Sequence, residues 1–505
     1  MKKLARASTS QDVKDMMLNL NSVHGHGDME HVAKEIRNFS RKEYDMDEIT
    51  LNCYNLFGRL YKFIHRWRAG RVMGFSEIYK SNNFRARKIV WLSFLILDMH
   101  LHRTSQLEIL RSLRKRGHDT RLIAMRSKNV FPNRNSEVRI TSVPLRYVPA
   151  ISPLMFAIMT FFFLPFYIIV SKPDFIITEP DLPIFSFISA LPFSRCKRTK
   201  LVLDIRSIPV ETVGFRGFHQ KFWFSVSILV AKKLFDGMTI ITPLMREEIC
   251  NTFEIDSCNV GTWSSGVDTR FFSPENYTSE GVELKRKLGL PGRFVVFYHG
   301  VFSATRGLKE AVESMKILRS DYPNVVLFLL GTGPIVSMLK HVVQKEGLQE
   351  YVIIHDPVDY AEVPKFVEMS DVCIIPLPDH PYWRFQCPLK LLEYLAMEKV
   401  VILTDIPAHR AVIGEAKCGV YISSVNPMEI AKAIEHVQLN KDSLDELGKI
   451  GREIVKREYT WEKVAVSLEN YLLSIYEPRK NRSNSCQKAY DFALQNHETN
   501  SLQQK

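Results

Sequence analysis

Lys390 and Glu393 are the residues whose types and spacing best suit binding of a phosphate-bearing ligand. They lie in the segment P-L-K-L-L-E-Y-L-A-M-E-K-V (388–400), in which apolar residues recur at helical spacing. Pro388 suits the first turn, and the N-terminus of such a helix offers N–H groups and a positive dipole end to a phosphate. Lys390 would stand beside that anion site, and the Glu393 carboxylate would accept hydrogen bonds from two neighbouring hydroxyls of a sugar. The alternative is that Lys390 and Glu393 form an ordinary i, i+3 surface pair.

Strands and helices alternate around this segment in the second half of the chain. Short apolar runs predict buried strands at Phe294–His299, Val325–Leu330, Tyr351–His355, Val372–Pro376 and Val400–Leu403. Helices are predicted at about 428–438 and 460–476. Gly300 opens the loop after the first of these strands, while Gly331 and Gly333 close the second strand ahead of a helix. The second half therefore reads as an α/β domain.

The first half begins with a strand–helix–strand unit. The strand Lys88–Leu97, the helix Thr104–Arg116 and the strand His118–Ala124 are followed by strands at 174–178, 201–205 and 237–241. Asp204 and Arg206 lie at the carboxyl end of the strand 201–205, and open α/β sheets bind ligands beyond the carboxyl ends of their strands. The alternative for these two residues is a structural ion pair.

Composition and charge restrict the class of protein. The chain has 505 residues, 46% of them hydrophobic and 24% charged, which allows two or three domains with sizeable cores. Its formal net charge of +13 attracts phosphates, nucleotides or anionic lipid heads. We find no nucleic-acid-binding signature, so nucleic acid is not a predicted partner. The eight cysteines form no C-x-x-C, which predicts buried thiols in a reducing compartment, and no secretory signal follows Met1-Lys2-Lys3.

Several motifs resemble those of the retaining glycosyltransferases of family 4, which have the two-domain GT-B fold. The segment 388–402 is similar to P-x-K-x-x-E-Y-M-A-x-G-K-P-V-V, and G-V-D-T-R-F-F (266–272) is similar to the end of N-G-V-D-x-x-x-F, with Ser265 in place of the asparagine. Residues 300–308 resemble G-x-x-x-x-x-K-G-L, residues 331–334 resemble G-x-G-P, and residues 371–376 resemble the D-V-x-x-x-P of S-D-V-x-x-x-P. The resemblance covers roughly residues 88–475.

The resemblance implies a function and a set of site residues. It implies transfer of a sugar from a nucleotide-sugar donor to a glycan or lipid-linked acceptor, with retention at the anomeric carbon, no metal and no cofactor besides the donor. The diphosphate would be held by basic side chains and helix N–H groups, and preorganised donors of this kind can replace a cation. The implied residues fall in three groups: Arg306, Lys390 and Glu393 for catalysis; Gly300, Gly331, Gly333, Pro388 and Leu389 for the donor; Asp204 and Arg206 for the acceptor or sugar.

Three departures from the family pattern support a rival interpretation. Phe385 stands where the family commonly has the first of two glutamates, although the P-x-K-x-x-E branch often lacks it too. Val301 replaces an arginine, and the loop Asp98–Arg103 contains no glycine. These departures favour a catalytically silent GT-B-like binding or scaffold protein. The sequence identifies neither the sugar, the nucleotide base nor the acceptor.

Two stretches indicate contact with an anionic membrane surface. In Tyr61–Lys88, basic residues are interleaved with aromatic ones, a composition that suits an anionic membrane surface. The alternative interpretation is that this segment forms a solvated charged face. Leu154–Val170 runs for seventeen residues without a charge and contains Pro165. A spanning helix needs about 20 residues, so an interfacial or core helix is favoured over a span. The prediction is a cytoplasmic protein attached peripherally to the inner face of a membrane.

The expected architecture is α/β and GT-B-like, with two doubly wound, Rossmann-like parallel-sheet domains facing a cleft. Polar residues around Pro274 suit the boundary between the two halves. The predicted organisation is an N-terminal extension (1–87), an acceptor-side domain (88–275), a donor-side domain (285–455), a crossing helix (456–478) and a disordered tail (479–505).

Overall fold

The computed structural model describes residues 85–96, 103–125, 138–143, 151–209 and 214–476. All of these residues belong to one compact unit, Asn83–Lys505. The N-terminal extension up to residue 84, the basic and aromatic run from Tyr61 as far as residue 84, most of the glycine-free loop Asp98–Arg103 and the C-terminal tail lie outside the described residues.

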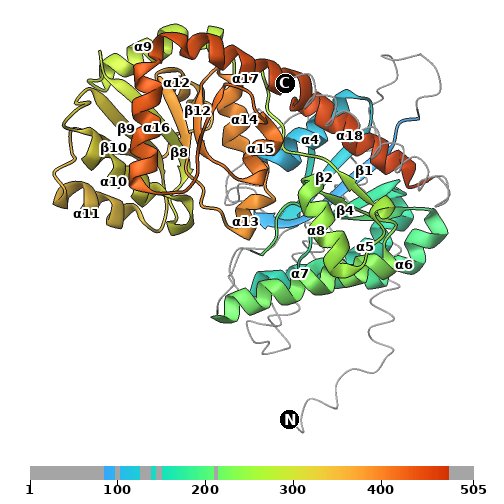
Figure 1. Cartoon of the computed structure of the whole chain (residues 1–505). Helices are drawn as coiled ribbons and strands as arrows, with labels where there is room; N and C mark the ends of the chain where they lie inside the picture. The colour runs from blue at the N-terminus through green and yellow to red at the C-terminus, as the bar shows by residue number, and fades with distance from the viewer. Residues whose placement is uncertain (1–84, 97–102, 126–137, 144–150, 210–213, 477–505) are drawn as a thin grey trace, which may run out of the picture. The chain divides into compact units, whose positions relative to one another are not determined.

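The first domain is built on a seven-stranded sheet in the order β3-β2-β1-β4-β5-β6-β7 (Figure 1). Every pairing between neighbouring strands is parallel. The strands are β1 (Lys88–Ile96), β2 (Asp119–Met125), β3 (Arg139–Val143), β4 (Phe175–Thr178), β5 (Lys200–Ile205), β6 (Gly237–Ile240) and β7 (Val260–Thr262). The chain starts at the central strand β1, runs outward to β3, and then returns to β4 and runs outward to β7 on the other side. This reversal of direction between β1 and β4 makes the domain doubly wound.

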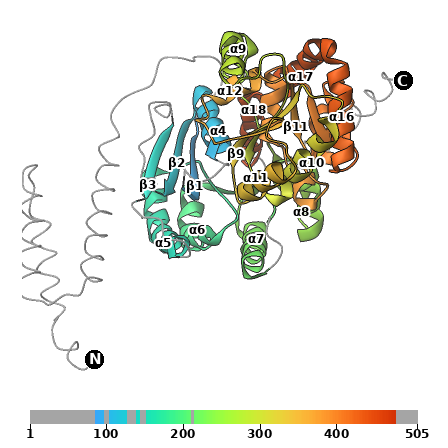
Figure 2. The ribbon, with the colours of Figure 1, turned by 90° about the vertical axis from the view of Figure 1, so that its left-hand side faces the viewer.

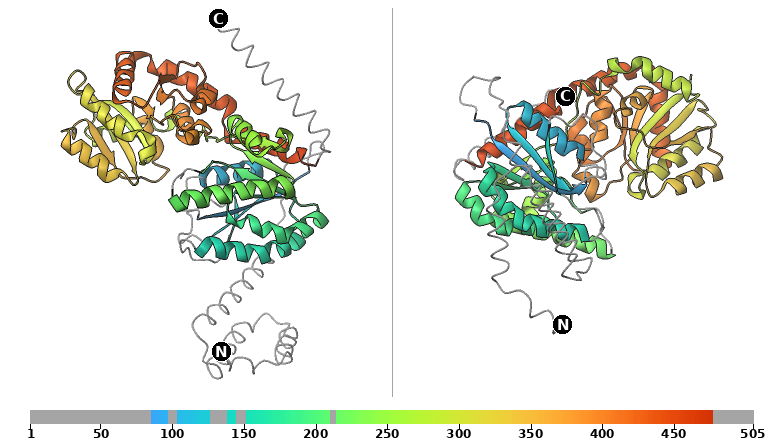
Figure 3. Two further views of the ribbon diagram at one scale, coloured as in Figure 1. Left: turned by 60° about the horizontal axis from the view of Figure 1, so that its bottom comes forward. Right: turned by 180° about the vertical axis from the view of Figure 1, so that it is seen from behind.

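Helices cover both faces of this sheet (Figures 1 and 3). One face carries α4 (Arg103–Lys115) and α18 (Trp461–Ser474), which share a hydrophobic core with Ile89 and Trp91 of β1. The other face carries α5 (Ile151–Ser171), α6 (Ser186–Lys197) and α7 (Gly214–Leu234). Figure 2 shows α5 and α6 side by side below β1, β2 and β3.

The second domain repeats the plan with a six-stranded parallel sheet in the order β10-β9-β8-β11-β12-β13. Its strands are β8 (Phe294–Val301), β9 (Val325–Thr332), β10 (Val352–His355), β11 (Val372–Ile375), β12 (Val401–Thr404) and β13 (Gly419–Ile422). The core between this sheet and its helices includes side chains of α10 (Leu308–Leu318), α11 (Val336–Lys345) and α16 (Pro427–Leu439). The fold class predicted from the sequence, two doubly wound parallel-sheet domains, is thus confirmed.

The chain returns to the first domain at its C-terminal end. After α17 (Leu444–Glu458), α18 packs on α4, and the Trp461 and Leu468 side chains enter the first domain's core. The Tyr471 hydroxyl accepts a hydrogen bond from Met238 N at 3.0 Å and donates to Asn259 O at 2.5 Å. A Cβ at Gly261 would overlap the Tyr471 ring, so glycine is required for this close approach.

Candidate functional site

A pocket of about 280 Å³ lies where the carboxyl end of β8 meets the start of α14 (Leu389–Ala396). It brings together seven of the residues singled out from the sequence. Of these, Gly300, Arg306, Pro388, Leu389, Lys390 and Glu393 come from the second domain and Arg206 comes from the first. Open α/β sheets bind ligands at this edge, so the pocket is the candidate site.

The helix α14 begins one residue later than predicted. Pro388 has an extended backbone (φ −67°, ψ 118°) and is the N-cap, so it precedes the first turn instead of lying within it. Two hydrogen bonds to backbone oxygens fix this entry from the first domain: Thr242 Oγ1 donates to Phe385 O at 2.8 Å and Ser265 Oγ donates to Cys387 O at 2.9 Å. The N-terminus of α14 is therefore held in place at the pocket.

Lys390 is a buried ammonium group without an anionic partner. Its Nζ lies 3.8 Å from the centroid of the Tyr298 ring, and it has no hydrogen-bond partner among the described residues. Burial, followed by the nearby Arg306 charge, holds the pKa of Lys390 well below its usual range. A Cβ at Gly300 would lie 3.0 Å from this Nζ, and Gly300 has a φ of +129°, which favours glycine. A buried cation of this kind favours an anionic ligand, because an anion would offset its desolvation.

Arg306 brings a second positive charge to the same pocket. It ends a 3-10 turn (Ala304–Arg306), and its guanidinium lies 4.8 Å from the centroid of the Trp383 ring. Trp383 is itself fixed, because its Nε1 donates to Thr305 O at 2.9 Å. A guanidinium can bind two phosphate oxygens at once, so Arg306 and Lys390 together suit a diphosphate.

Glu393 is held by two residues that the sequence analysis did not single out. Its Oε1 accepts a hydrogen bond from the Tyr360 hydroxyl at 2.7 Å, and its Oε2 lies 3.0 Å from His299 Nε2. The Tyr394 hydroxyl accepts from the backbone N–H of His299 and lies 3.0 Å from His299 Nδ1. Because a carboxylate only accepts, His299 Nε2–H donates to Glu393, and in a neutral imidazole Nδ1 then accepts from the Tyr394 hydroxyl.

This network orients the Glu393 carboxylate and leaves some of its hydrogen-bond acceptor positions unused. A carboxylate oxygen has two acceptor positions, so each oxygen of Glu393 keeps one for a ligand hydroxyl. A sequence signal existed for both missed residues. His299 lies near the carboxyl end of β8, and Tyr360 follows β10, which is separated from β8 by β9, so both lie at the sheet edge where open α/β sheets bind ligands.

Gly331 and Gly333 do not line the pocket but pack against the backbone of Gly300 and Phe302. A Cβ at Gly331 would lie 2.0 Å from Gly300 O, and a Cβ at Gly333 would lie 2.2 Å from Phe302 O. These glycines allow the loops after β8 and β9 to pack backbone against backbone. Their contact with the donor remains a prediction.

Asp204 is also placed away from the pocket. It is fully buried, and its Oδ1 accepts hydrogen bonds from Thr239 Oγ1 at 2.6 Å and Trp263 Nε1 at 2.7 Å. Asp204 Oδ2 is buried with no hydrogen-bond partner among the described residues, and the expected contact of Asp204 with acceptor or sugar remains a prediction. Arg206 does line the pocket, stacked on the Trp263 ring at 3.7 Å, with NH1 donating to Trp263 O at 2.8 Å.

Glu179, near Asp204 at the end of β4, gives a pH-dependent prediction. Its Oε2 accepts a hydrogen bond from Ser93 Oγ at 3.2 Å, and its Oε1 is buried with no hydrogen-bond partner among the described residues. Burial, and then the Asp204 charge, raise the pKa of Glu179 from 4.5 to about 8. Because folding raises this pKa, the charged form costs stability. The cost is absent below pH 4.5, grows as the pH rises and is complete above about 8.

Glu179→Gln should therefore raise the melting temperature more at alkaline than at acidic pH. The gain above the folded pKa should be on the order of 1–3 kcal/mol, the desolvation cost of a buried polar group. Thermal denaturation of both proteins across this pH range measures the difference. An equal gain at all pH values would contradict the assignment of a buried, titrating carboxyl.

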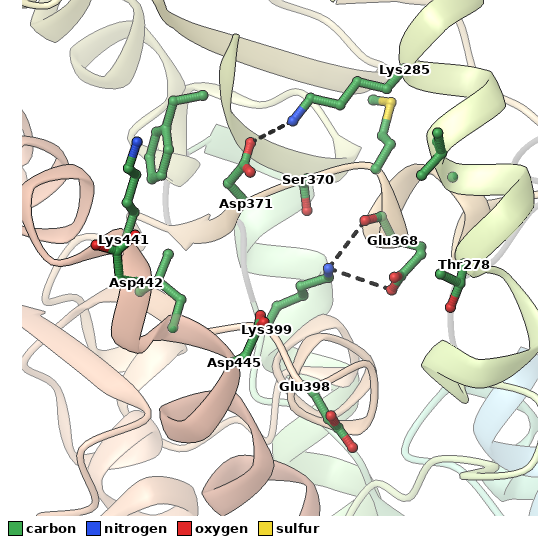
Figure 4. Close-up of a pocket in the computed structure, with 15 residues that line it drawn as sticks. Thr278, Lys285, Glu368, Ser370, Asp371, Glu398, Lys399, Lys441, Asp442 and Asp445 are labelled. Carbon is green, nitrogen blue, oxygen red and sulfur yellow. Dashed lines mark hydrogen bonds and ion pairs between the residues drawn. The ribbon is translucent and has the colours of Figure 1, made fainter. Parts of the chain in front are cut away.

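A larger pocket, of about 380 Å³, lies at the opposite, amino-terminal edge of the second sheet (Figure 4). Its cations face carboxylates: Lys285 Nζ lies 2.9 Å from Asp371 Oδ2, and Lys399 Nζ lies 3.4 Å from Glu368 Oε2. Asp371 Oδ2 also accepts a hydrogen bond from Val295 N at 2.7 Å. Lys285 and Lys399 are thus already paired with carboxylates, whereas Lys390 in the smaller pocket has no hydrogen-bond partner among the described residues. The smaller pocket is therefore the better candidate site.

No group of three or more histidine, cysteine, aspartate or glutamate side chains lies close enough to hold a metal ion within the part of the chain that the structure describes. In the candidate site the positive charge is supplied by side chains, namely Arg206, Arg306 and Lys390. The predicted catalysis without a metal remains a prediction.

Comparison with known proteins agrees with this fold. Residues 282–454, which form most of the second domain, match the family model "Glycosyl transferases group 1". The spore coat protein SA of Bacillus subtilis is 26% identical over 48% of this chain and 64% of its own length. The D-inositol 3-phosphate glycosyltransferase of Paenarthrobacter aurescens is 21% identical over 46% of this chain and 55% of its own length. The chain thus spans little more than half of these relatives.

Solved structures share the whole two-domain fold. A glycosyltransferase from Rickettsia africae matches with a TM-score of 0.62 and 16% identity, over 78% of this chain and all of its own. Anabaena HepE in complex with UDP and glucose matches with a TM-score of 0.61 and 13% identity, over 77% of this chain and all of its own. At these identities the likeness shows the fold, which is that of the GT-B glycosyltransferases.

Proposed function

We propose that this chain is a glycosyltransferase that moves a sugar from a nucleotide-sugar donor to a glycan or lipid-linked acceptor, with retention of the anomeric configuration and without a metal. The observation that carries the proposal is the unpaired, buried Lys390 ammonium next to Arg306 in the pocket at the carboxyl edge of the second sheet. Support comes from the match of the second domain to group 1 glycosyl transferases and from the motif resemblance.

The proposed reaction breaks the bond between the anomeric carbon and a phosphate oxygen of the donor. The electron pair stays on the leaving diphosphate, whose growing negative charge Arg306, Lys390 and the N–H groups at the start of α14 would stabilise. The acceptor hydroxyl oxygen forms the new bond to the anomeric carbon. With retention, this oxygen approaches from the face that the phosphate leaves, so a phosphate oxygen is placed to take the hydroxyl proton.

Glu393 serves the donor's nucleoside part in this proposal. It is the one carboxylate among the described residues that line the pocket, and Tyr360 and His299 fix its orientation. Its remaining acceptor positions suit the two ribose hydroxyls. The departure at Phe385 leaves the recognition of the transferred sugar to other residues.

A second candidate is a catalytically silent GT-B-like protein that binds a nucleotide or sugar as part of a scaffold. Two observations favour it. Phe385 stands at the usual position of the first glutamate, and Val301, which lines the pocket, replaces a positive charge.

Titration calorimetry with nucleotide diphosphates and nucleotide sugars, followed by mass spectrometry of each donor with candidate acceptors, separates the two functions. A glycosyltransferase should bind one nucleotide class and release its diphosphate when an acceptor is present. Binding without turnover for every acceptor would favour the scaffold. Absence of nucleotide binding would overturn both.

A further inference from the structure

The helix α5 exposes a continuous apolar stripe. It is the one helix among the described residues that is long and apolar enough to cross a membrane, over Ser152–Ser171. The exposed side chains recur at spacings of three, four and one, so they lie on one side of the helix over about 22 Å. They are Leu154, Ile158, Phe161, Phe162, Phe166 and Ile169, and Phe162 is 73% exposed.

The opposite side of α5 is fixed in the first domain. Phe156, Leu164 and Ile168 are buried, and the helix is tied to α6 by hydroxyl groups. Ser186 Oγ lies 2.6 Å from Thr160 Oγ1 and donates to Ala157 O at 2.9 Å. A helix bound in this way lies along the domain surface, and an exposed apolar stripe of this size is typical of an interaction surface.

The stripe continues onto α6 and α7. Phe185 packs on Trp223 with ring centroids 5.3 Å apart, and Trp223 in turn contacts Phe222 at 5.1 Å. On α7 the residues Phe218, Phe222, Leu229 and Lys233 share one side at helical spacing, and Phe218 is 67% exposed. We call the exposed side chains of α5, α6 and α7 the apolar face; α6 adds Ile188 and Phe193 to it. All three helices lie on the same side of the first sheet (Figure 3).

The charged residues of α5, α6 and α7 are all basic, and one of them, Arg195, pairs with Asp236 at 3.1 Å. The three helices contain no aspartate or glutamate, whereas α6 and α7 contain the basic residues Arg195, Lys197, Arg216, Lys221, Lys232 and Lys233. A symmetric dimer through this face would bring identical cations together. An anionic bilayer offers both an apolar interior for the aromatic side chains and negative head groups for the lysines.

We propose that the apolar face docks on an anionic lipid bilayer, with α5 lying in the plane of the membrane and its stripe in the boundary between head groups and acyl chains. This deepens the proposed function, because it rests on an acceptor held in lipid and identifies the surface that reaches it. Membrane docking and nucleotide binding use different residues, so an experiment can contradict one of these two proposals without contradicting the other.

Flotation of the full-length protein with vesicles tests the docking. The protein should float with vesicles of phosphatidylcholine and phosphatidylglycerol, should float poorly with phosphatidylcholine alone and should be released by high salt. Phe162→Ser and Phe218→Ser should each weaken binding about tenfold, since each removes an inserted aromatic side chain. Lys233→Glu should weaken binding to the anionic vesicles only.

Matched controls lie on the second domain. Leu439 on α16 is 68% exposed, so Leu439→Ser removes a comparably exposed side chain, and Lys449→Glu reverses an exposed charge on α17. Both should bind vesicles like the unaltered protein. All five variants should keep the unaltered melting temperature and nucleotide affinity, which separates a docking defect from a failed transferase.

Three results would overturn the proposal. One is vesicle binding that Phe162→Ser and Phe218→Ser leave unchanged. Another is a dimer in lipid-free solution that Phe162→Ser dissociates, which would assign the face to a second copy. The third is protein that resists both salt and alkaline carbonate and leaves membranes only with detergent, which would show that α5 spans the bilayer.

Discussion

Replacing Lys390 by methionine should abolish most turnover and yet make the unliganded protein more stable. In the proposed reaction the ammonium stabilises the charge on the leaving diphosphate, and loss of such a group costs about 2.7–4 kcal/mol, or roughly 10²–10³-fold in kcat. In the unliganded protein the same group is buried without a hydrogen-bond partner. Its removal should therefore recover about 1–3 kcal/mol of desolvation.

The stability gain of Lys390→Met should depend on pH. Folding lowers the pKa of Lys390, so protonation favours the unfolded chain. The penalty is complete below the lowered, folded pKa and vanishes once the pH exceeds the ordinary lysine value of about 10.4. Melting temperatures should accordingly differ most below the lowered, folded pKa and converge in alkali.

Lys399→Met is the matched control. Lys399 Nζ donates to Glu368 O at 3.1 Å and pairs with the Glu368 carboxylate, at the opposite edge of the sheet from the pocket. This variant should lose stability and keep its turnover. Arg306→Ala should lose turnover to a similar extent as Lys390→Met, with little change in melting temperature. A Lys390→Met protein that melts lower and turns over normally would make Lys390 a structural residue.

Glu393→Gln should weaken nucleotide binding by about 10–100-fold, the range expected for loss of a charged hydrogen-bond acceptor. The glutamine keeps the size of the side chain but replaces one acceptor oxygen by an NH₂ donor. That group cannot accept the hydrogen bond that Tyr360 or His299 now donates. Calorimetric titration with the nucleotide that the donor screen identifies measures the loss.

Tyr360→Phe provides the comparison for Glu393→Gln. It removes one hydrogen bond to Glu393 Oε1 and frees an acceptor position for a ribose hydroxyl. Nucleotide affinity should then stay equal or increase. If both variants lose affinity equally, the carboxylate serves to hold Tyr360 and does not bind the nucleotide.

The fold was predictable because most strands of both sheets are buried on both faces. Runs such as Phe294–His299 and Val372–Pro376 are mostly apolar; the first is followed by Gly300 and the second ends in proline. The strands that the sequence analysis missed are β3, β7 and β13, all in outer positions of a sheet. All three are edge strands, and edge strands need only part of their surface to be apolar, so R-I-T-S-V (139–143) gives no such run.

The candidate site was predictable where one short segment supplies several residues and not where distant segments meet. Pro388, Leu389, Lys390 and Glu393 lie within six consecutive positions, so helical spacing brings them to one pocket. The contact between His299 and Glu393 joins residues 94 positions apart, which no local pattern encodes. The hydrogen bond from Trp263 to Asp204 likewise joins residues 59 positions apart, so the surroundings of Asp204 could not be predicted from its strand position.

The return of α18 to the first domain bears on how the protein is synthesised. Trp461, Val464, Leu468 and Leu472 complete the hydrophobic core against β1 and α4, although about 345 residues separate them from that helix. On the ribosome the second domain has all of its strands before this helix emerges. The domain that is translated first is therefore finished last, and its open core is a surface for chaperones until the final helix arrives.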